Sequence, residues 1–191
     1  MLNNEYQFLT EWEIAAPRAL LYEILKEGRA YPRWWPDVYL HADYEASGRP
    51  DQIGDRVTLL TKGWLPYRLR WTAIAEAYEA PQRIVIRAEG DFVGRGIWLL
   101  EETANGTRVS FDWRLRADKF LLRWLSPLCK PVFQWNHHWA MKTGQHRLAA
   151  EAQRRLAQNA ITSPASTSDA SGNASGAALT AANERGNVQA D

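Results

Sequence analysis

The feature that most constrains this chain is a long amphipathic pattern near its end, which follows an almost unbroken run of strand-like segments. The pattern has helical periodicity over about residues 119–158, and its apolar stripe is unusually aromatic. A sheet and one long apolar-faced helix bury both surfaces most simply if the sheet curls around the helix. The sequence therefore predicts an α+β fold in which a curved antiparallel sheet wraps around a long C-terminal helix.

Short segments of alternating apolar and polar residues precede this helix and predict about seven strands. The first strand is expected over residues 6–14, and a short helix begins at Pro17 and ends near Gly28. Six further strand patterns then occupy residues 38–45, 55–61, 67–77, 83–88, 92–102 and 108–116. Short links between sequential strands favour an antiparallel meander, and Asn105-Gly106 is typical of a type I′ hairpin turn.

Two motifs between these elements have structural interpretations. The segment Tyr31-Pro32-Arg33-Trp34-Trp35-Pro36 predicts a tight turn or one helical turn, in which Trp34 and Trp35 serve packing rather than ligand contact. Gly90, Gly94 and Gly96 are followed by more strand pattern instead of a helix. We therefore expect these glycines to permit sheet bending or close backbone approach, not to form a phosphate-binding loop.

The alternation also assigns one face of each central strand to the interior. In residues 108–116 the apolar positions alternate strictly with charged or hydroxylated ones, and residues 67–75 follow the same pattern. The predicted inner faces carry several large side chains: Tyr67, Leu69, Trp71, Trp98, Phe111 and Trp113.

A helical projection of the C-terminal pattern places eight residues on one face: Leu121, Leu125, Leu128, Val132, Trp135, Asn136, Trp139 and Thr143. Asn136 is a polar group on this stripe, and a buried amide needs hydrogen-bond partners. It is expected to bind either a ligand carbonyl or hydroxyl group, or the sheet or a Trp indole.

Composition and charge narrow the range of functions. A formal net charge of +1 does not indicate a nucleic-acid binder. Cys129 is the only cysteine, which excludes an internal disulfide and fits a buried thiol in a reducing compartment. His137, His138 and His146 lack the spacing of a metal-binding helix and have no nearby carboxylate or thiol. We therefore expect no metal site and no cofactor.

The pattern divides the chain into one domain, residues 1–158, and a tail, residues 159–191. The tail is rich in Ala, Ser, Thr and Asn and has no aromatic residue, so we expect it to be disordered. The first residues lack a basic start and an apolar stretch, which predicts a cytoplasmic protein without a targeting segment.

The segment from Phe120 to Phe133 is almost wholly apolar but contains two prolines, which argues against a transmembrane span. With Arg123 and Lys130 it could dock at a membrane surface while a lipid enters the fold. The alternative, which we favour, is a segment that folds over the sheet edge and closes the core.

About residues 5–155 resemble the START-like helix-grip superfamily (SRPBCC), which includes the bacterial polyketide cyclase/dehydrase-like proteins. The resemblance rests on the element order and on the motifs at residues 31–36, 61–71, 94–98 and 135–139. It implies a deep apolar cavity between the concave sheet and the long helix, which members use for lipids, sterols, polyketides and other hydrophobic molecules. Some members of this superfamily also catalyse cyclisation or dehydration.

The leading hypothesis is therefore the binding of a hydrophobic or aromatic small molecule between sheet and helix. The candidate ligand-binding residues are Tyr67, Leu69, Trp71, Trp98, Phe111, Trp113, Val132, Trp135, Asn136, Trp139 and Thr143. The competing interpretation is that the aromatic residues among them simply fill the core.

Two alternative functions are a cyclase or dehydrase acting in the same cavity and a lipid carrier at a membrane surface. Catalysis would require proton-transfer groups in the cavity. The sequence offers only a few candidates on the inner faces or near the helix end, and they form no acid/base pair: Tyr67, Asn136, Thr143, His146 and Arg147.

Overall fold

A computed structural model describes residues 5–91, 93–116 and 120–162 of the chain, with side chains within α3 (Phe120–Thr162) described at position 131 and from position 134 onward. The strands are β1 (Glu5–Ile14), β2 (Tyr39–Glu45), β3 (Arg56–Lys62), β4 (Arg68–Glu79), β5 (Arg83–Gly90), β6 (Val93–Thr103) and β7 (Gly106–Arg116). The shorter helical elements are α1 (Arg18–Lys26), the 3₁₀ turn η1 (Gly28–Ala30) and α2 (Tyr31–Trp34).

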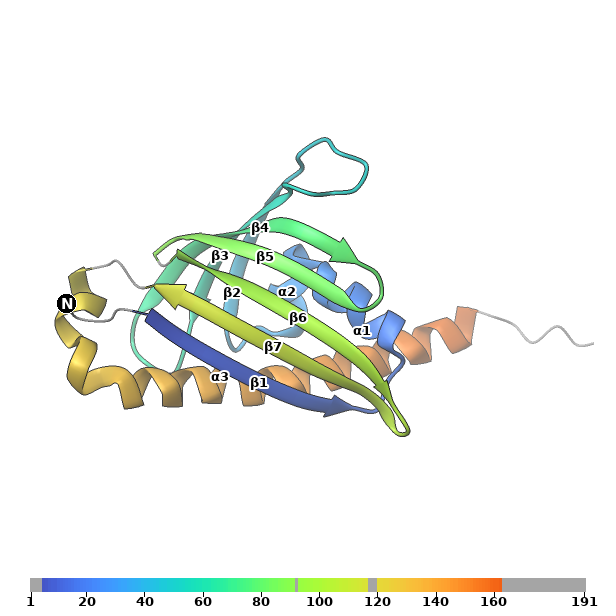
Figure 1. The fold of residues 1–191 in the computed structure, drawn as a ribbon. Coiled ribbons are helices and arrows are strands. Elements are labelled where there is room, and N and C mark those ends of the chain that lie inside the picture. Colours follow the sequence, from blue (N-terminus) through green and yellow to red (C-terminus); the bar gives the residue numbers. More distant parts are fainter. Residues whose placement is uncertain (1–4, 92, 117–119, 163–191) are drawn as a thin grey trace, which may run out of the picture.

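The seven strands form one antiparallel sheet in the order β1-β7-β6-β5-β4-β3-β2. Strands β2 to β7 are a meander in which each strand pairs with the next, and β1 closes on β7 along ten residues. Figure 1 shows the sheet curling over α3, with α1 and α2 at one end of the concave face. The predicted α+β helix-grip architecture is thus confirmed.

The strand faces follow the predicted alternation. In β7 the side chains of Val109, Phe111 and Trp113 are buried, whereas Arg108 and Arg114 are exposed. Gly96 in β6 is also buried, and a Cβ atom at this position would lie 2.8 Å from the ring of Trp113. Gly96 therefore lets the indole lie flat across the neighbouring strand, which is the close approach that the glycine pattern predicts.

The hairpin between β6 and β7 forms where Asn105-Gly106 indicates it, but the predicted type I′ turn is wrong. Thr103 pairs with Gly106, so Ala104 and Asn105 are the central residues of the turn. Gln52 alone has a positive φ among the described non-glycine residues, so Asn105 does not adopt the conformation that type I′ requires. Gly106 instead begins β7 with φ 144°, and a Cβ there would overlap the carbonyl oxygen of Ile14.

The core lies at the end of the sheet that α1, α2 and the second half of α3 cover. Segment 31–36 forms the predicted single helical turn, and its Trp34 and Trp35 are both buried. Gly144 of α3 packs directly on the ring of Trp35, where a Cβ atom would overlap the indole. The helix can approach the sheet here because this position has no side chain.

The final helix continues to Thr162, four residues beyond the predicted end of the pattern at residue 158. The remainder of the predicted tail, residues 163–191, lies outside the described part of the chain. The side chains of the apolar segment before Gln134, including Cys129 but not Pro131, also lie outside the described part.

Candidate functional site

A cavity of about 470 Å³ lies between the concave face of the sheet and α3. Inward-facing residues of β3, β4, β6 and β7 form one wall, and α3 with the segment around α1 and η1 forms the other. The lining is mainly apolar and aromatic, as expected for a site that buries an apolar molecule.

Four aromatic rings form a continuous array on the sheet side of this cavity. Trp98 and Phe111 are stacked with centroids 4.0 Å apart, Phe111 stacks on Trp113 at 5.4 Å, and Trp71 meets Trp113 at 5.7 Å. All four rings line the cavity, together with Tyr67 and Leu69. The sheet half of the sequence-predicted site is therefore brought together on one concave surface.

Of the helix half of the predicted site, the structure places Asn136 at the cavity but not the other residues whose side chains it describes. Trp135 is 47% exposed, and neither Trp135 nor Trp139 nor Thr143 lines the cavity. Thr143 donates its hydroxyl hydrogen to the carbonyl of Trp139 within the helix. Val132 has a side chain outside the described residues.

The orientation of α3 about its own axis explains this difference between the predicted and the observed inward face. Its buried positions include Met141, Gly144, Leu148 and Ala152, which follow one another at helical spacing. Small side chains on this stripe allow the helix to approach Trp35, and a bulky indole would keep it away. The cavity-facing residues of α3 are consequently Asn136, His137, Ala140, Met141 and, further along, Arg155.

Asn136 lines the cavity, but its amide oxygen is engaged by the backbone. Asn136 Oδ1 accepts hydrogen bonds from the amide nitrogens of Trp64 at 2.7 Å and Leu65 at 3.4 Å. The side chain thus holds the β3–β4 connection against α3. Of the two expected partners for this amide, a ligand or the sheet, the observed hydrogen bonds are nearer to the second. Only its amide NH₂ group is left to donate a hydrogen bond to a ligand.

His137 is a cavity residue that is not among the eight residues of the predicted apolar stripe. Its imidazole stacks on Phe8 with centroids 4.2 Å apart, and Nε2 lies 3.5 Å from the Thr10 hydroxyl oxygen. Burial and the adjacent His138 lower the pKa of His137 to about 4, so the ring is neutral at neutral pH. A neutral imidazole offers one donor and one acceptor inside an apolar cavity.

The other polar candidates near the helix end do not reach the cavity. His146 is exposed, and Arg147 forms an ion pair with Asp37 with Nε 2.6 Å from Oδ2. Within the described residues, no three His, Cys, Asp or Glu side chains are grouped as metal ligands would be. His137 and His138 point apart, one into the cavity and the other to the surface.

Four tyrosines, Tyr31, Tyr39, Tyr44 and Tyr78, line the opposite end of the cavity next to α1, together with charged side chains such as Arg29 and Asp55. Burial raises the pKa of Tyr31 and Tyr39, and it raises the pKa of Tyr78 to about 12. Tyr31 donates its hydroxyl hydrogen to the Leu25 carbonyl at 2.7 Å, and the Tyr44 hydroxyl donates to Asp55. These phenols therefore remain neutral, and sequence alternation missed them because most lie in irregular or edge segments.

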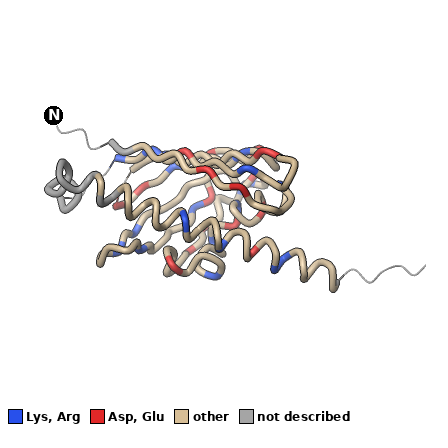
Figure 2. Tube along the Cα trace, turned by 90° about the horizontal axis from the view of Figure 1, so that it is seen from below, with Lys and Arg blue, Asp and Glu red and all other residues tan. Residues whose placement is uncertain are grey.

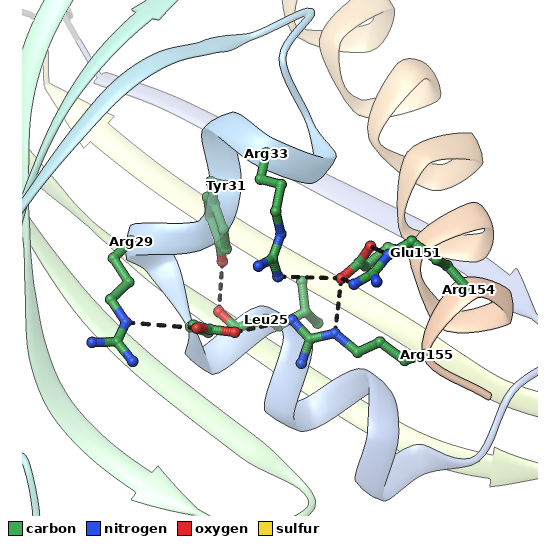
Figure 3. Close-up of polar contacts among 8 residues, drawn as sticks. Leu25, Arg29, Tyr31, Arg33, Glu151, Arg154 and Arg155 are labelled. Carbon is green, nitrogen blue, oxygen red and sulfur yellow. Dashed lines mark hydrogen bonds and ion pairs between the residues drawn. The ribbon is translucent and has the colours of Figure 1, made fainter. Parts of the chain in front are cut away.

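An ion-pair cluster lies at this end, where α3 meets the segment after α1 and α2, as Figure 3 shows. Arg155 contacts Glu27 at 2.9 Å and Glu151 at 2.8 Å, and it shares Glu151 with Arg33 and Arg154. Hydrogen bonds from Arg154 and Arg155 lower the pKa of Glu151 to about 2. The cluster fixes α3 to α1 and α2, and Glu27 and Arg155 also line the cavity.

The fold and cavity define a START-like helix-grip protein, and comparisons with known proteins agree. Residues 7–159 match the family described as "Polyketide cyclase / dehydrase and lipid transport". The match covers most of the chain, and the protein belongs to this family. No curated protein matches the sequence significantly.

Solved structures with the same fold include aromatase/cyclases. The two-domain aromatase/cyclase BexL of the BE-7585A biosynthetic pathway aligns with a TM-score of 0.64 at 12% identity, over 78% of this chain and 50% of BexL. The Zhui aromatase/cyclase of Streptomyces sp. R1128 aligns at 0.60 and 17% identity, over 80% and 94% of the two chains. A START superfamily protein of Mycobacterium smegmatis aligns at 0.58 and 14% identity, over 78% and 97%.

These structural likenesses are distant in sequence, so they establish the fold and not the ligand. The chain spans half the length of BexL. Within the described residues, no helix is long and apolar enough to cross a bilayer.

Proposed function

We propose that this protein binds a hydrophobic or aromatic small molecule, lipid-like or polyketide-like, in the cavity between the sheet and α3. The observation that carries this proposal is the cavity of about 470 Å³, whose sheet wall is the array of Trp71, Trp98, Phe111 and Trp113. Cavities of about 300–1,000 Å³ with apolar walls and few polar groups are typical small-molecule sites.

The polar groups beside the aromatic array include neutral ones, which favour a ligand with carbonyl or hydroxyl groups, and the charged lining residues lie mainly at the end next to α1. The His137 imidazole and the Asn136 NH₂ group face one end, and the phenol of Tyr39 lines the other. Each can form one or two hydrogen bonds without adding charge to the apolar wall. Together they would orient a ligand whose body stacks on the aromatic array.

Tryptophan fluorescence during ligand titration tests the proposal, because three indoles line the cavity wall on the sheet side. Fatty acids, sterols and aromatic polyketides are titrated into the wild-type protein and into Ala140→Phe, which puts a ring into the cavity from α3. We expect a saturable change with at least one class in the wild type, and a loss of affinity of about tenfold or more in Ala140→Phe.

Ala150→Phe is the matched control, because Ala150 is exposed on the same helix. It should bind like the wild type. If no ligand class changes the emission at micromolar concentration, or if both variants bind equally well, the binding proposal fails.

A second candidate function is a cyclisation or dehydration of the bound molecule, and His137 is the observation that favours it. A neutral imidazole beside the substrate can exchange protons, although a pKa near 4 makes it a weak base at neutral pH. Recovery of the ligand after the titration separates the two candidates. A pure binding protein returns the ligand unchanged, whereas an enzyme returns a product whose formation depends on His137.

A further inference from the structure

Two exposed tryptophans lie together where the β3–β4 connection meets α3. Trp64 is 62% exposed and Trp135 is 47% exposed, and their rings meet edge to face with centroids 4.5 Å apart. Every other tryptophan whose side chain the structure describes is buried or half-buried. An exposed indole pair keeps a large apolar area in water, which is unfavourable unless something else covers it.

This pair borders the ligand cavity. Gly63 and Asn136, the chain neighbours of the two tryptophans, both line the cavity. The hydrogen bond from the Trp64 amide to Asn136 Oδ1 joins the two segments at that point. Whatever covers the tryptophans therefore lies next to an opening of the cavity, where Lys62 is both exposed and part of the lining.

The surroundings of the tryptophans are basic. Lys62 and Arg68 are cross-strand partners on either side of Trp64, and Lys142 lies two helical turns after Trp135 on the same side of α3. None of these three cations forms an ion pair with a carboxylate in the described parts of the chain. Arg68 and Lys142 are exposed cations that can meet an external anion, whereas Lys62 helps Arg147 to lower the pKa of Asp37.

The sequence of α3 extends this bias. From Phe120 to Ala150 it contains Arg123, Lys130, Lys142 and Arg147 but no Asp or Glu, and the first acidic residue is Glu151. Figure 2 shows mainly blue positions along the described part of this helix. Arg147 is paired with Asp37, whereas the exposed Lys142 lies nearer to Trp135 along the helix.

We propose that the surface formed by Trp64, Trp135, Lys62, Arg68 and Lys142, the mouth surface, docks on an anionic phospholipid bilayer. Indole rings favour the headgroup level of a membrane, and lysines and arginines beside them attract anionic lipids. This inference rests on the proposed function, because docking places the opening of the cavity at the bilayer, where an apolar ligand can pass without crossing water. The contact is a surface association in which the domain stays folded outside the bilayer.

Co-sedimentation with vesicles tests the proposal. The full chain is mixed with vesicles of phosphatidylglycerol and phosphatidylcholine, or with vesicles of phosphatidylcholine alone. We expect the wild type to pellet with the anionic vesicles, and less so as salt is added. Neutralising Arg68 and Lys142 in the double variant Arg68→Gln/Lys142→Gln should weaken partitioning about fivefold per charge.

The variant Trp64→Ser/Trp135→Ser should abolish most of the remaining binding, whereas Leu9→Ser and Arg49→Gln are matched controls. Leu9 is 68% exposed on β1, and Arg49 is an exposed cation in the β2–β3 connection. Unchanged thermal unfolding shows that each variant is folded. Equal pelleting of the wild type and the mouth-surface variants, or of the wild type with both vesicle types, overturns the proposal.

Two further readouts separate membrane docking from self-association and from ligand binding in the cavity. If the wild type forms a concentration-dependent dimer that the Trp64→Ser/Trp135→Ser variant loses, and neither pellets, the surface joins two copies of this chain and the membrane proposal is overturned. Ligand titration in vesicle-free solution should be unaffected by Arg68→Gln/Lys142→Gln, because both residues are exposed and neither lines the cavity. A loss of vesicle binding with intact ligand binding therefore tests docking separately from the cavity.

Discussion

At the scale of single residues, the buried carboxylate of Glu151 is the strongest electrostatic feature of the molecule. Its side chain is 5% exposed, and three arginines approach it: Arg33 from α2 and Arg154 and Arg155 from the same helix. A buried carboxylate without such partners would be strongly unfavourable. Glu151 therefore contributes to stability through charge-assisted hydrogen bonds that only the folded arrangement provides.

Replacing Glu151 by Gln should lower the free energy of unfolding at pH 7 by about 2 kcal/mol, since a neutral amide leaves the arginines uncompensated. The pKa of Glu151 falls from its ordinary 4.5 to about 2 on folding. Its contribution is therefore complete above pH 4.5 and disappears as the pH falls toward 2. Urea denaturation of both proteins at several pH values checks this.

The difference between wild type and Glu151→Gln should shrink steadily between pH 4.5 and 2. A difference that does not change across this range would mean that the cluster stabilises the fold by packing rather than by charge. Arg49→Gln, which removes an exposed ion-pair partner of Asp51, should leave the free energy of unfolding nearly unchanged at every pH.

Sequence reasoning at this scale succeeded for side chains on strands and failed for most of those on α3. Side chains alternate between the two faces of a strand, so the polar positions determine that Trp71, Trp98 and Trp113 point inward. His137 was missed because the tryptophans dominated the helical projection. His137 lies at helical spacing from Met141, Gly144 and Leu148, and this spacing could have revealed it. A histidine and a glycine, however, contribute little to a pattern that is defined by hydrophobic residues.

At the scale of elements, the strands were predictable because turn residues and alternation mark them independently of tertiary structure. The meander order follows from the short links, and each predicted strand corresponds to an observed one. The rotation of α3 was not predictable in this way. It is set by steric fit at Gly144 against Trp35, a contact between residues far apart in the sequence.

Gly144→Ala tests whether this contact seats α3. Alanine favours a helix by up to about 1 kcal/mol over glycine. At this position, however, its methyl group would overlap the Trp35 ring, and overpacking of this kind costs about 1–3 kcal/mol. We expect a net loss of stability, measured by chemical denaturation.

The double variant Gly144→Ala/Trp35→Leu provides the control, because a smaller side chain at position 35 removes the overlap. The cost of Gly144→Ala should be smaller in this background, which a double-mutant cycle detects. If Gly144→Ala stabilises the protein in both backgrounds, α3 is not seated by this contact.

At the scale of the whole molecule, the cavity has two chemically different ends. One end, at Asn136 and His137, lies beside the basic and aromatic mouth surface. The other end is lined by tyrosines and carries the ion pair of Glu27 and Arg155. Ion pairs hold α3 in place at one end of the cavity, and exposed tryptophans border the other end. This arrangement suits the uptake and retention of an apolar molecule.

The existence of such a cavity could be inferred from the sequence, but not its polar lining. Conformation and burial at Tyr31, Tyr39 and Tyr78 depend on how α1, η1 and α2 fold back on the sheet, and no periodic pattern encodes that arrangement. The family resemblance supplied the architecture, and the ligand has to be read from the cavity itself.

Native mass spectrometry of freshly purified protein tests the central claim, ligand binding in this cavity, most directly. We expect the wild type to carry a co-purified apolar small molecule that is released on collisional activation, or to take one up from an added mixture of fatty acids, sterols and aromatic polyketides. Ala140→Phe should appear with the mass of the bare chain, and Ala150→Phe should behave as the wild type. A wild-type chain that remains bare under all these conditions would contradict ligand binding in the cavity.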